Sequence, residues 1–297
     1  MTATSTTVPP ALGRITPRFG PLLFLRRLFR TTQAQLGGAL VLLLLLTALF
    51  APALAPHDPY ELMVGPPMAP PSPAFPFGTD DLGRDMLSRI MFGSRITVKI
   101  GVISVALALG IGVTIGLVAG FYGGAVDSLL MRFTDLALAF PGFLLTLAIV
   151  AVLGPGLNNA MIAVGIGAFP GFARLVRGSV LSIRETEYGA AARVLGATPA
   201  RIIVRSILPN AMAPIVVLAT LAFPLAVLDA AALSFLGLGA QPPTPEWGAL
   251  LIDGRNYLRT APHLVNIPGA AIFATVLGFN LIGNSLRDAL DPRLRAR

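Results

Sequence analysis

The sequence predicts an all-α protein that crosses a membrane several times. Hydrophobic residues make up 55% of the 297 positions and charged residues only 12%, a balance outside the range of soluble globular proteins. Mean hydropathy is +0.77. Several stretches also reach the roughly 20 mainly apolar residues that a membrane helix needs.

The apolar stretches give six predicted transmembrane helices. The stretch 136–173 has no charged residue and is long enough for two spans joined at 153–159. The first span lacks a small-x-small cleavage site followed by a soluble domain, so we expect an anchor rather than a cleaved signal peptide. The other predicted spans are 36–55, 100–126, 206–228 with a continuation to about 238, and 264–286.

The basic residues predict which side of the membrane each loop faces. The chain has 22 Lys and Arg, and all but six fall on the side that holds both termini and the segment 174–210. Because cytoplasmic loops carry an excess of Lys and Arg, we expect both termini in the cytoplasm. The net charge of +8 therefore indicates topology rather than nucleic-acid binding.

The predicted organisation follows these spans. It consists of a cytoplasmic segment at 1–35, the first helix at 36–55, an external loop at 56–95, a five-helix core at 96–290 and a cytoplasmic tail at 291–297. In the external loop, Thr79 or Asp80 is expected to cap an amphipathic helix lying on the bilayer surface. A cap over the outer pore mouth is the alternative. The apolar face of this helix is Leu82, Met86, Leu87, Ile90 and Met91.

Several residues inside the spans carry specific expectations. Proline removes a helical hydrogen bond, so each Pro-Gly pair predicts a bend, although such pairs also occur in membrane helices without a functional role. These pairs are Pro141-Gly142, Pro170-Gly171 and Pro268-Gly269. Four-residue spacing of Gly112, Gly116 and Gly120 predicts close helix packing.

Two carboxylates lie within the apolar spans. Asp135 is three residues from Arg132, which predicts a local ion pair. Asp229 has no basic residue within twenty positions. An ionisable group there should face a water-filled path or a partner, so Asp229 is a candidate for the translocation path. A structural hydrogen bond is the alternative.

Catalytic and nucleotide-binding motifs are missing from the chain. Its single lysine, Lys99, does not belong to the Gly-x-x-x-x-Gly-Lys-Ser/Thr pattern of a nucleotide-binding loop. Cysteine is absent, and His57 and His263 lie in separate loops. We therefore expect no catalytic residue, metal site or cofactor in this chain. ATP and Mg²⁺, if used, are bound by separate subunits.

The segment 174–210 reads as a helix–turn–helix. Gly196 is suited to end a first helix, and Thr198 followed by Pro199 is suited to begin a second. Pro209 is expected to mark a bend into the next span. Such regular helix signals favour a docking element over a simple linker.

These residues resemble the EAA coupling loop of bacterial ABC-importer permeases. The matching positions are Ala190, Ala191, Ala192, Gly196, Ala197, Leu208 and Pro209. The family's glutamate falls at Ala190, and Ser206 stands where isoleucine is usual. Glu187 lies one turn earlier and is the substitute carboxylate. Contact through shape rather than a salt bridge is therefore expected. The stretches 77–95, 139–145, 233–248 and 280–295 are similar to the second permease of dipeptide and oligopeptide importers.

The resemblance implies a type I ABC-importer permease fold with six transmembrane helices in the bacterial plasma (inner) membrane. It also implies a homologous second permease subunit, two ATP-binding cassette subunits and an external solute-binding protein. Di- or oligopeptides are the expected substrates, with nickel or another small solute as the alternative. From other classes, an ion-coupled secondary carrier that uses Asp229 and a membrane scaffold also remain.

Overall fold

The computed structural model describes residues 28–184 and 198–290, apart from the side chains of Arg184 and Ser206. The described chain is helical, and one isolated bridge between Thr79 and Asp85 is the only β pairing within it. Five helices are long and apolar enough to cross a membrane. A sixth span results if the bent pair α4–α5 counts as one. The predicted number, six, is the upper end of this range.

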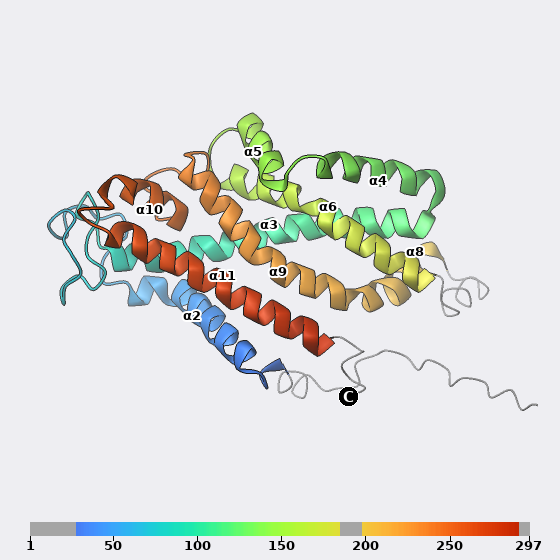
Figure 1. Ribbon diagram of the computed structural model, residues 1–297, viewed down its shortest axis with the longest axis horizontal. Coiled ribbons are helices and arrows are strands. Elements are labelled where there is room, and N and C mark those ends of the chain that lie inside the picture. Colours follow the sequence, from blue (N-terminus) through green and yellow to red (C-terminus); the bar gives the residue numbers. More distant parts are fainter. Residues whose placement is uncertain (1–27, 185–197, 291–297) are drawn as a thin grey trace, which may run out of the picture.

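The helices lie mostly along the long axis of the molecule (Figure 1). The predicted loop between two spans at 153–159 becomes a short connection between α5 and α6. The long helices are α2 (Thr32–Leu54), α3 (Met86–Tyr122), α6 (Leu157–Arg184), α9 (Leu208–Phe235) and α11 (His263–Leu290), and the shorter elements are α4 (Gly124–Leu138), α5 (Gly142–Leu153), α8 (Pro199–Ile202), the π-helix η1 (Ile203–Ile207), α10 (Trp247–Gly254) and the 3₁₀ helix η2 (Arg255–Tyr257).

Helix α3 corrects the prediction of a separate amphipathic helix on the bilayer surface. Asp85, rather than Thr79 or Asp80, caps the helix by accepting a hydrogen bond from the Ser88 N–H. From Met86 the helix continues without a break for 37 residues, roughly 55 Å at 1.5 Å per residue. That length exceeds the roughly 30 Å hydrocarbon core. Met86 and Ile90 are buried against α10 and α11 rather than facing lipid.

Helix α3 ends at a sharp reversal. Gly123 and Gly124 have φ angles of +67° and +55°. This left-handed region costs glycine nothing and is unfavourable for other residues. The helix therefore stops at Tyr122, four residues before the predicted end of the span, and α4 runs back along the edge of the bundle (Figure 1).

The glycine stripe of α3 packs against α6, as predicted. A Cβ added at Gly112 would lie 2.5 Å from the Phe172 Cβ, and one at Gly116 would lie 2.6 Å from the Ala173 oxygen. At Gly120 the nearest atom would be the Val180 Cβ, at 2.7 Å. The two backbones approach so closely because the stripe has no side chains.

Aromatic packing joins α9 to α3 and α11. The rings of Phe223 and Phe279 stack with centroids 3.9 Å apart. Phe223 also covers Gly101 of α3, where an added Cβ would lie 2.2 Å from the ring. The main buried core therefore lies among α3, α6 and α9, with α11 closing one side.

Candidate functional site

The predicted coupling segment 174–210 begins inside a helix. Helix α6 extends to Arg184, so Arg174 and Arg177 belong to its last turns rather than to a loop. The predicted contact residues Glu187, Ala190, Ala191, Ala192, Gly196 and Ala197 lie outside the described residues. Leu208 and Pro209 are described and open α9.

The second half of the segment starts as predicted. Thr198 is extended and Pro199 occupies the first helical position, although the Thr198 side chain makes no capping hydrogen bond. The chain then remains helical from Pro199 to Phe235. Pro209 therefore does not end the helix. It follows the π turn η1, in which the Leu208 N–H bonds to the Ile203 oxygen. The wider turn accommodates a proline, which has no N–H to donate.

The helical turns at 199–207 are anchored on one face and open on the other. Ile202 and Ile207 are buried in a cluster with Val176 and Val180 of α6. On the opposite face, Val204 is 60% exposed, and Arg201 and Arg205 are exposed beside it. The packing of Ile202 and Ile207 against α6 thus leaves Val204 exposed between Arg201 and Arg205.

The ion pairs of α6 correct the predicted partner of Asp135. Its carboxylate accepts from Arg174 Nη2 at 2.7 Å and forms no ion pair with Arg132. A second pair joins Arg177 to Asp127 in a two-pronged arrangement, with Nε–Oδ1 and Nη2–Oδ2 distances of 2.6 and 2.7 Å. Both pairs connect α6 to α4, so they depend on packing and not on sequence neighbours.

The three Pro-Gly pairs differ in their effect. Pro141 lies at the break between α4 and α5, whose axes meet at 90°. Helices α6 and α11 continue through Pro170 and Pro268, with Gly171 and Gly269 next to them. Only the first pair therefore coincides with an interrupted helix.

Asp229 lies at the edge of the open face of α9. The side chain is half-buried: Leu225, one turn earlier, is 61% exposed, whereas Leu233, one turn later, is buried. Its carboxylate forms no hydrogen bond or ion pair with residues 28–184 or 198–290. An uncompensated carboxylate on an apolar helix face is a candidate contact for a partner or a solute.

At the opposite end of the molecule from the coupling segment, a buried charge network holds the loop between α2 and α3 in place. The Asp80 carboxylate accepts from the N–H groups of Leu82 and Arg84 at 2.9 Å each. Arg89, only 1% exposed, places Nη1 3.1 Å from Asp80 and Nη2 4.0 Å from Asp253 of α10. Burial raises the pKa of Asp253, and the charge of Arg89 opposes that rise. The distribution of basic residues in the sequence predicts only that Arg84 and Arg89 are charges of an external loop, and it does not predict this network.

A second set of contacts joins α3 to α10. The indole Nε1 of Trp247 donates to the Ile90 oxygen at 3.2 Å, and Gly93 lies beneath the ring. Glu246 caps α10 by accepting from the Ala249 N–H at 2.9 Å. Burial raises the pKa of Glu246, and hydrogen bonds from Gly248, Ser234 and Ala249 lower it by less. The motif stretches 77–95 and 233–248 thus pack into one unit at this end of the molecule, here called the cap.

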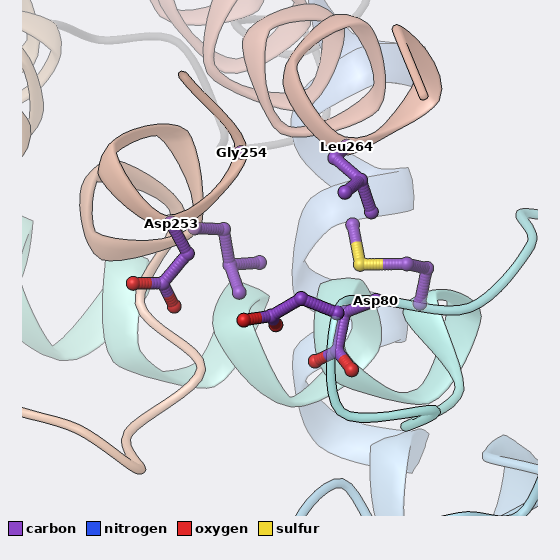
Figure 2. Close-up of a pocket in the computed structure, with 7 residues that line it drawn as sticks. Asp80, Asp253, Gly254 and Leu264 are labelled. Carbon is purple, nitrogen blue, oxygen red and sulfur yellow. The ribbon is translucent and has the colours of Figure 1, made fainter. Parts of the chain in front are cut away.

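The cap contains a cavity of about 10 Å³, roughly the space that one water molecule requires. Figure 2 shows the carboxyl groups of Asp80 and Asp253 on one side of it and Leu264 on the other. A peptide needs far more room. This cavity therefore belongs to the structure of the cap and is not a solute site. Its lining residues are Asp80, Asp81, Met86, Leu250, Asp253, Gly254 and Leu264.

Two known protein families match parts of this chain. The family described as binding-protein-dependent transport system inner membrane component matches residues 112–296. The N-terminal TM domain of oligopeptide transport permease C matches residues 22–76. Together the two matches cover most of the chain.

Curated relatives are similar over nearly the whole length. The dipeptide transport system permease protein DppC of Alkalihalophilus pseudofirmus is 48% identical over 91% of this chain and 89% of its own. The di/tripeptide transport system permease protein DppC of Pseudomonas aeruginosa is 47% identical, with 90% of each covered. The glutathione transport system permease protein GsiD of Pectobacterium atrosepticum is 46% identical, with 92% of this chain and 91% of its own covered.

Solved structures share the fold. An inward-facing MetNI methionine ABC transporter chain aligns with a TM-score of 0.55 at 22% identity, covering 69% of this chain and 98% of its own. An amino acid ABC transporter chain aligns with a TM-score of 0.51 at 19% identity, covering 69% and 95%. The chain belongs to the binding-protein-dependent transport system inner membrane component family and is a multi-pass inner-membrane permease subunit of an ABC importer.

Proposed function

We propose that this chain forms half of the transmembrane path for di- and oligopeptides in a type I importer with six transmembrane helices per permease. The names of the relatives support a peptide substrate, because dipeptide, di/tripeptide and glutathione permeases are 46–48% identical to this chain. Because the chain belongs to a binding-protein-dependent transport family, an importer subunit is the interpretation we adopt. It takes the place of the two alternatives, an ion-coupled carrier and a membrane scaffold.

The assembly we propose has a homologous second permease, two ATP-binding cassette subunits and an external solute-binding protein in the bacterial plasma membrane. The chain has no nucleotide-binding loop, so ATP and Mg²⁺ would bind to the cassette subunits. The excess of Lys and Arg on one side supports cytoplasmic termini. The coupling segment would then face the ATPase.

The anchored turns at 199–207 are the observation that carries the coupling proposal. Burial of Ile202 and Ile207 against α6 gives the segment a rigid base, and exposed Val204 offers an apolar contact between Arg201 and Arg205. A force applied to such an element reaches α6 and α9 directly. The remaining proposed contacts are Glu187, Ala190–Ala192, Gly196 and Ala197.

We also place Asp229 on the translocation path. The ammonium group of a peptide is a chemically suitable partner for a carboxylate without an internal counter-charge. The open apolar face around Asp229 would pack against the second permease or line the path between the two. The same role would favour cationic solutes over anionic ones.

Reconstitution of the complete importer in proteoliposomes tests the function. Labelled dipeptide should accumulate only with ATP and the binding protein, and Gly196→Glu should abolish uptake while Gly196→Ala retains it. Unchanged uptake by an assembled Gly196→Glu complex would contradict the coupling proposal. Uptake of nickel and not of dipeptide would contradict the substrate.

A further inference from the structure

Helix α4 has few buried contacts with the rest of the protein. Of its 15 residues only Thr134 is buried. Five large apolar side chains of the helix are exposed, and the most exposed are Leu129 at 70%, Leu136 at 63% and Phe133 at 57%. Burial of apolar surface therefore contributes little to holding α4 against its neighbours.

Two ion pairs, here called the α4–α6 ion pairs, tie this helix at both ends. Asp127 lies in its first turn and bonds to Arg177, and Asp135 lies in its last turn and bonds to Arg174. Between them, the ring of Phe133 stacks on Phe169 of α6 with centroids 6.0 Å apart. The Arg177–Asp127 pair uses both carboxylate oxygens, which fixes orientation as well as distance.

The two helices lead to different moving parts of an importer. Arg177 lies in the helical part of the coupling segment, two turns before α6 reaches Arg184. Its backbone is also held on α3, since an added Cβ at Gly116 would lie 3.0 Å from the Arg177 nitrogen. Helix α4 ends at the 90° break before α5. The α4–α6 ion pairs therefore connect the coupling segment to the broken span (Figure 1).

We propose that the α4–α6 ion pairs make α4 move with α6 during transport, so that displacement of the coupling segment reaches the α4–α5 break. This inference rests on the proposed importer function. Partly exposed ion pairs add little to folding stability, and the side chains of Arg174 and Asp135 are each 56% exposed. A positioning role accounts for two such pairs on one loosely packed helix. All four residues act through helix position and need not touch the solute.

The first test measures the number of dipeptides imported per ATP hydrolysed by the full complex in proteoliposomes. Arg177→Gln and Asp127→Asn should each lower this ratio about fivefold. The exchanged pair Asp127→Arg with Arg177→Asp should recover at least half of the wild-type ratio. Arg132→Gln is the control, because Arg132 is exposed on the same helix and forms no ion pair within the described part of the chain. Wild-type ratios in both single variants would overturn the proposal.

A distance measurement keeps the inference testable if the exchanged pair does not assemble. This chain has no cysteine, so Ser128→Cys on α4 and Ser182→Cys on α6 are its two spin-label sites, in a complex whose other subunits are made cysteine-free. The distance between the labels should be the same in nucleotide-free and ATP-trapped complexes, and Arg177→Gln should make it differ. A distance that changes in the parent complex would contradict joint movement.

These two measurements separate the inference from the proposed function. If the unmodified complex imports no dipeptide, the proposed substrate is wrong. The spin-label distance needs only ATP trapping, so it still decides whether α4 moves with α6.

Discussion

The indole of Trp247 donates a hydrogen bond to the main-chain oxygen of Ile90, which lies 157 residues earlier in the chain. This contact joins the short helix α10 to the first turns of α3, a helix longer than a bilayer crossing needs. Gly93 allows it, since an added Cβ would lie 2.4 Å from the indole nitrogen. The cap is therefore built on the first turns of α3.

Trp247→Phe should lower the melting temperature of the purified subunit. The change removes the hydrogen bond and part of a buried ring, at a cost of about 1–2 kcal/mol. Thermal melting followed by size-exclusion chromatography of a fluorescent fusion measures the effect. Tyr60→Phe is the control, because Tyr60 is 48% exposed. Equal melting temperatures of Trp247→Phe and wild type would show that the contact does not contribute to the stability of the subunit.

Glu246 should make the stability of the cap depend on pH. Its pKa is raised in the folded protein by burial, so the folded state binds the proton more tightly than the unfolded state. Stability from this group is then greatest below the ordinary glutamate pKa of about 4.3 and falls as the pH rises through the raised value.

Glu246→Gln should remove this dependence while keeping an oxygen that accepts from the Ala249 N–H. We expect the difference in melting temperature, variant minus wild type, to increase as the pH rises above the ordinary glutamate pKa of about 4.3. A difference that stays constant with pH would mean that the carboxyl has the same pKa in both states.

Gly112→Val should disturb the packing of α3 on α6, because a Cβ there meets the Phe172 Cβ at 2.5 Å and the Phe169 oxygen at 2.6 Å. Overpacking of this kind costs about 1–3 kcal/mol. Gly110→Val makes the same chemical change at a position where an added Cβ would meet no atom of another helix within 4 Å. The melting temperature of the first variant should fall below that of the second. Equal values would rule out close packing as the role of the stripe.

Asp229→Asn should reduce dipeptide uptake about tenfold in an assembled importer, if its charge contacts the peptide on the path. Asp229→Glu preserves the charge and should retain most of the uptake. Initial uptake rates at saturating ATP measure both variants against wild type. A normal rate with asparagine would exclude a charge-dependent role on the path.

The position of the spans was predictable because hydrophobicity is local. A run of about 20 apolar residues must become a helix in lipid wherever it lies in the chain. The four-residue spacing of Gly112, Gly116 and Gly120 similarly predicted a close helix contact, which α6 supplies. The start of the helix at Pro199 was also readable from neighbouring residues.

Tertiary structure decided what depends on distant neighbours. The amphipathic pattern of residues 82–91 fits lipid or protein equally well, and only the presence of α10 and α11 makes it a buried face. Asp135 had Arg132 nearby in sequence, yet the fold places Arg174 at 2.7 Å. Hydrophobicity thus determined which segments enter the membrane. The charge partners and the cap depended on three-dimensional packing, because a long arginine side chain can pair with any carboxylate that the fold brings within reach.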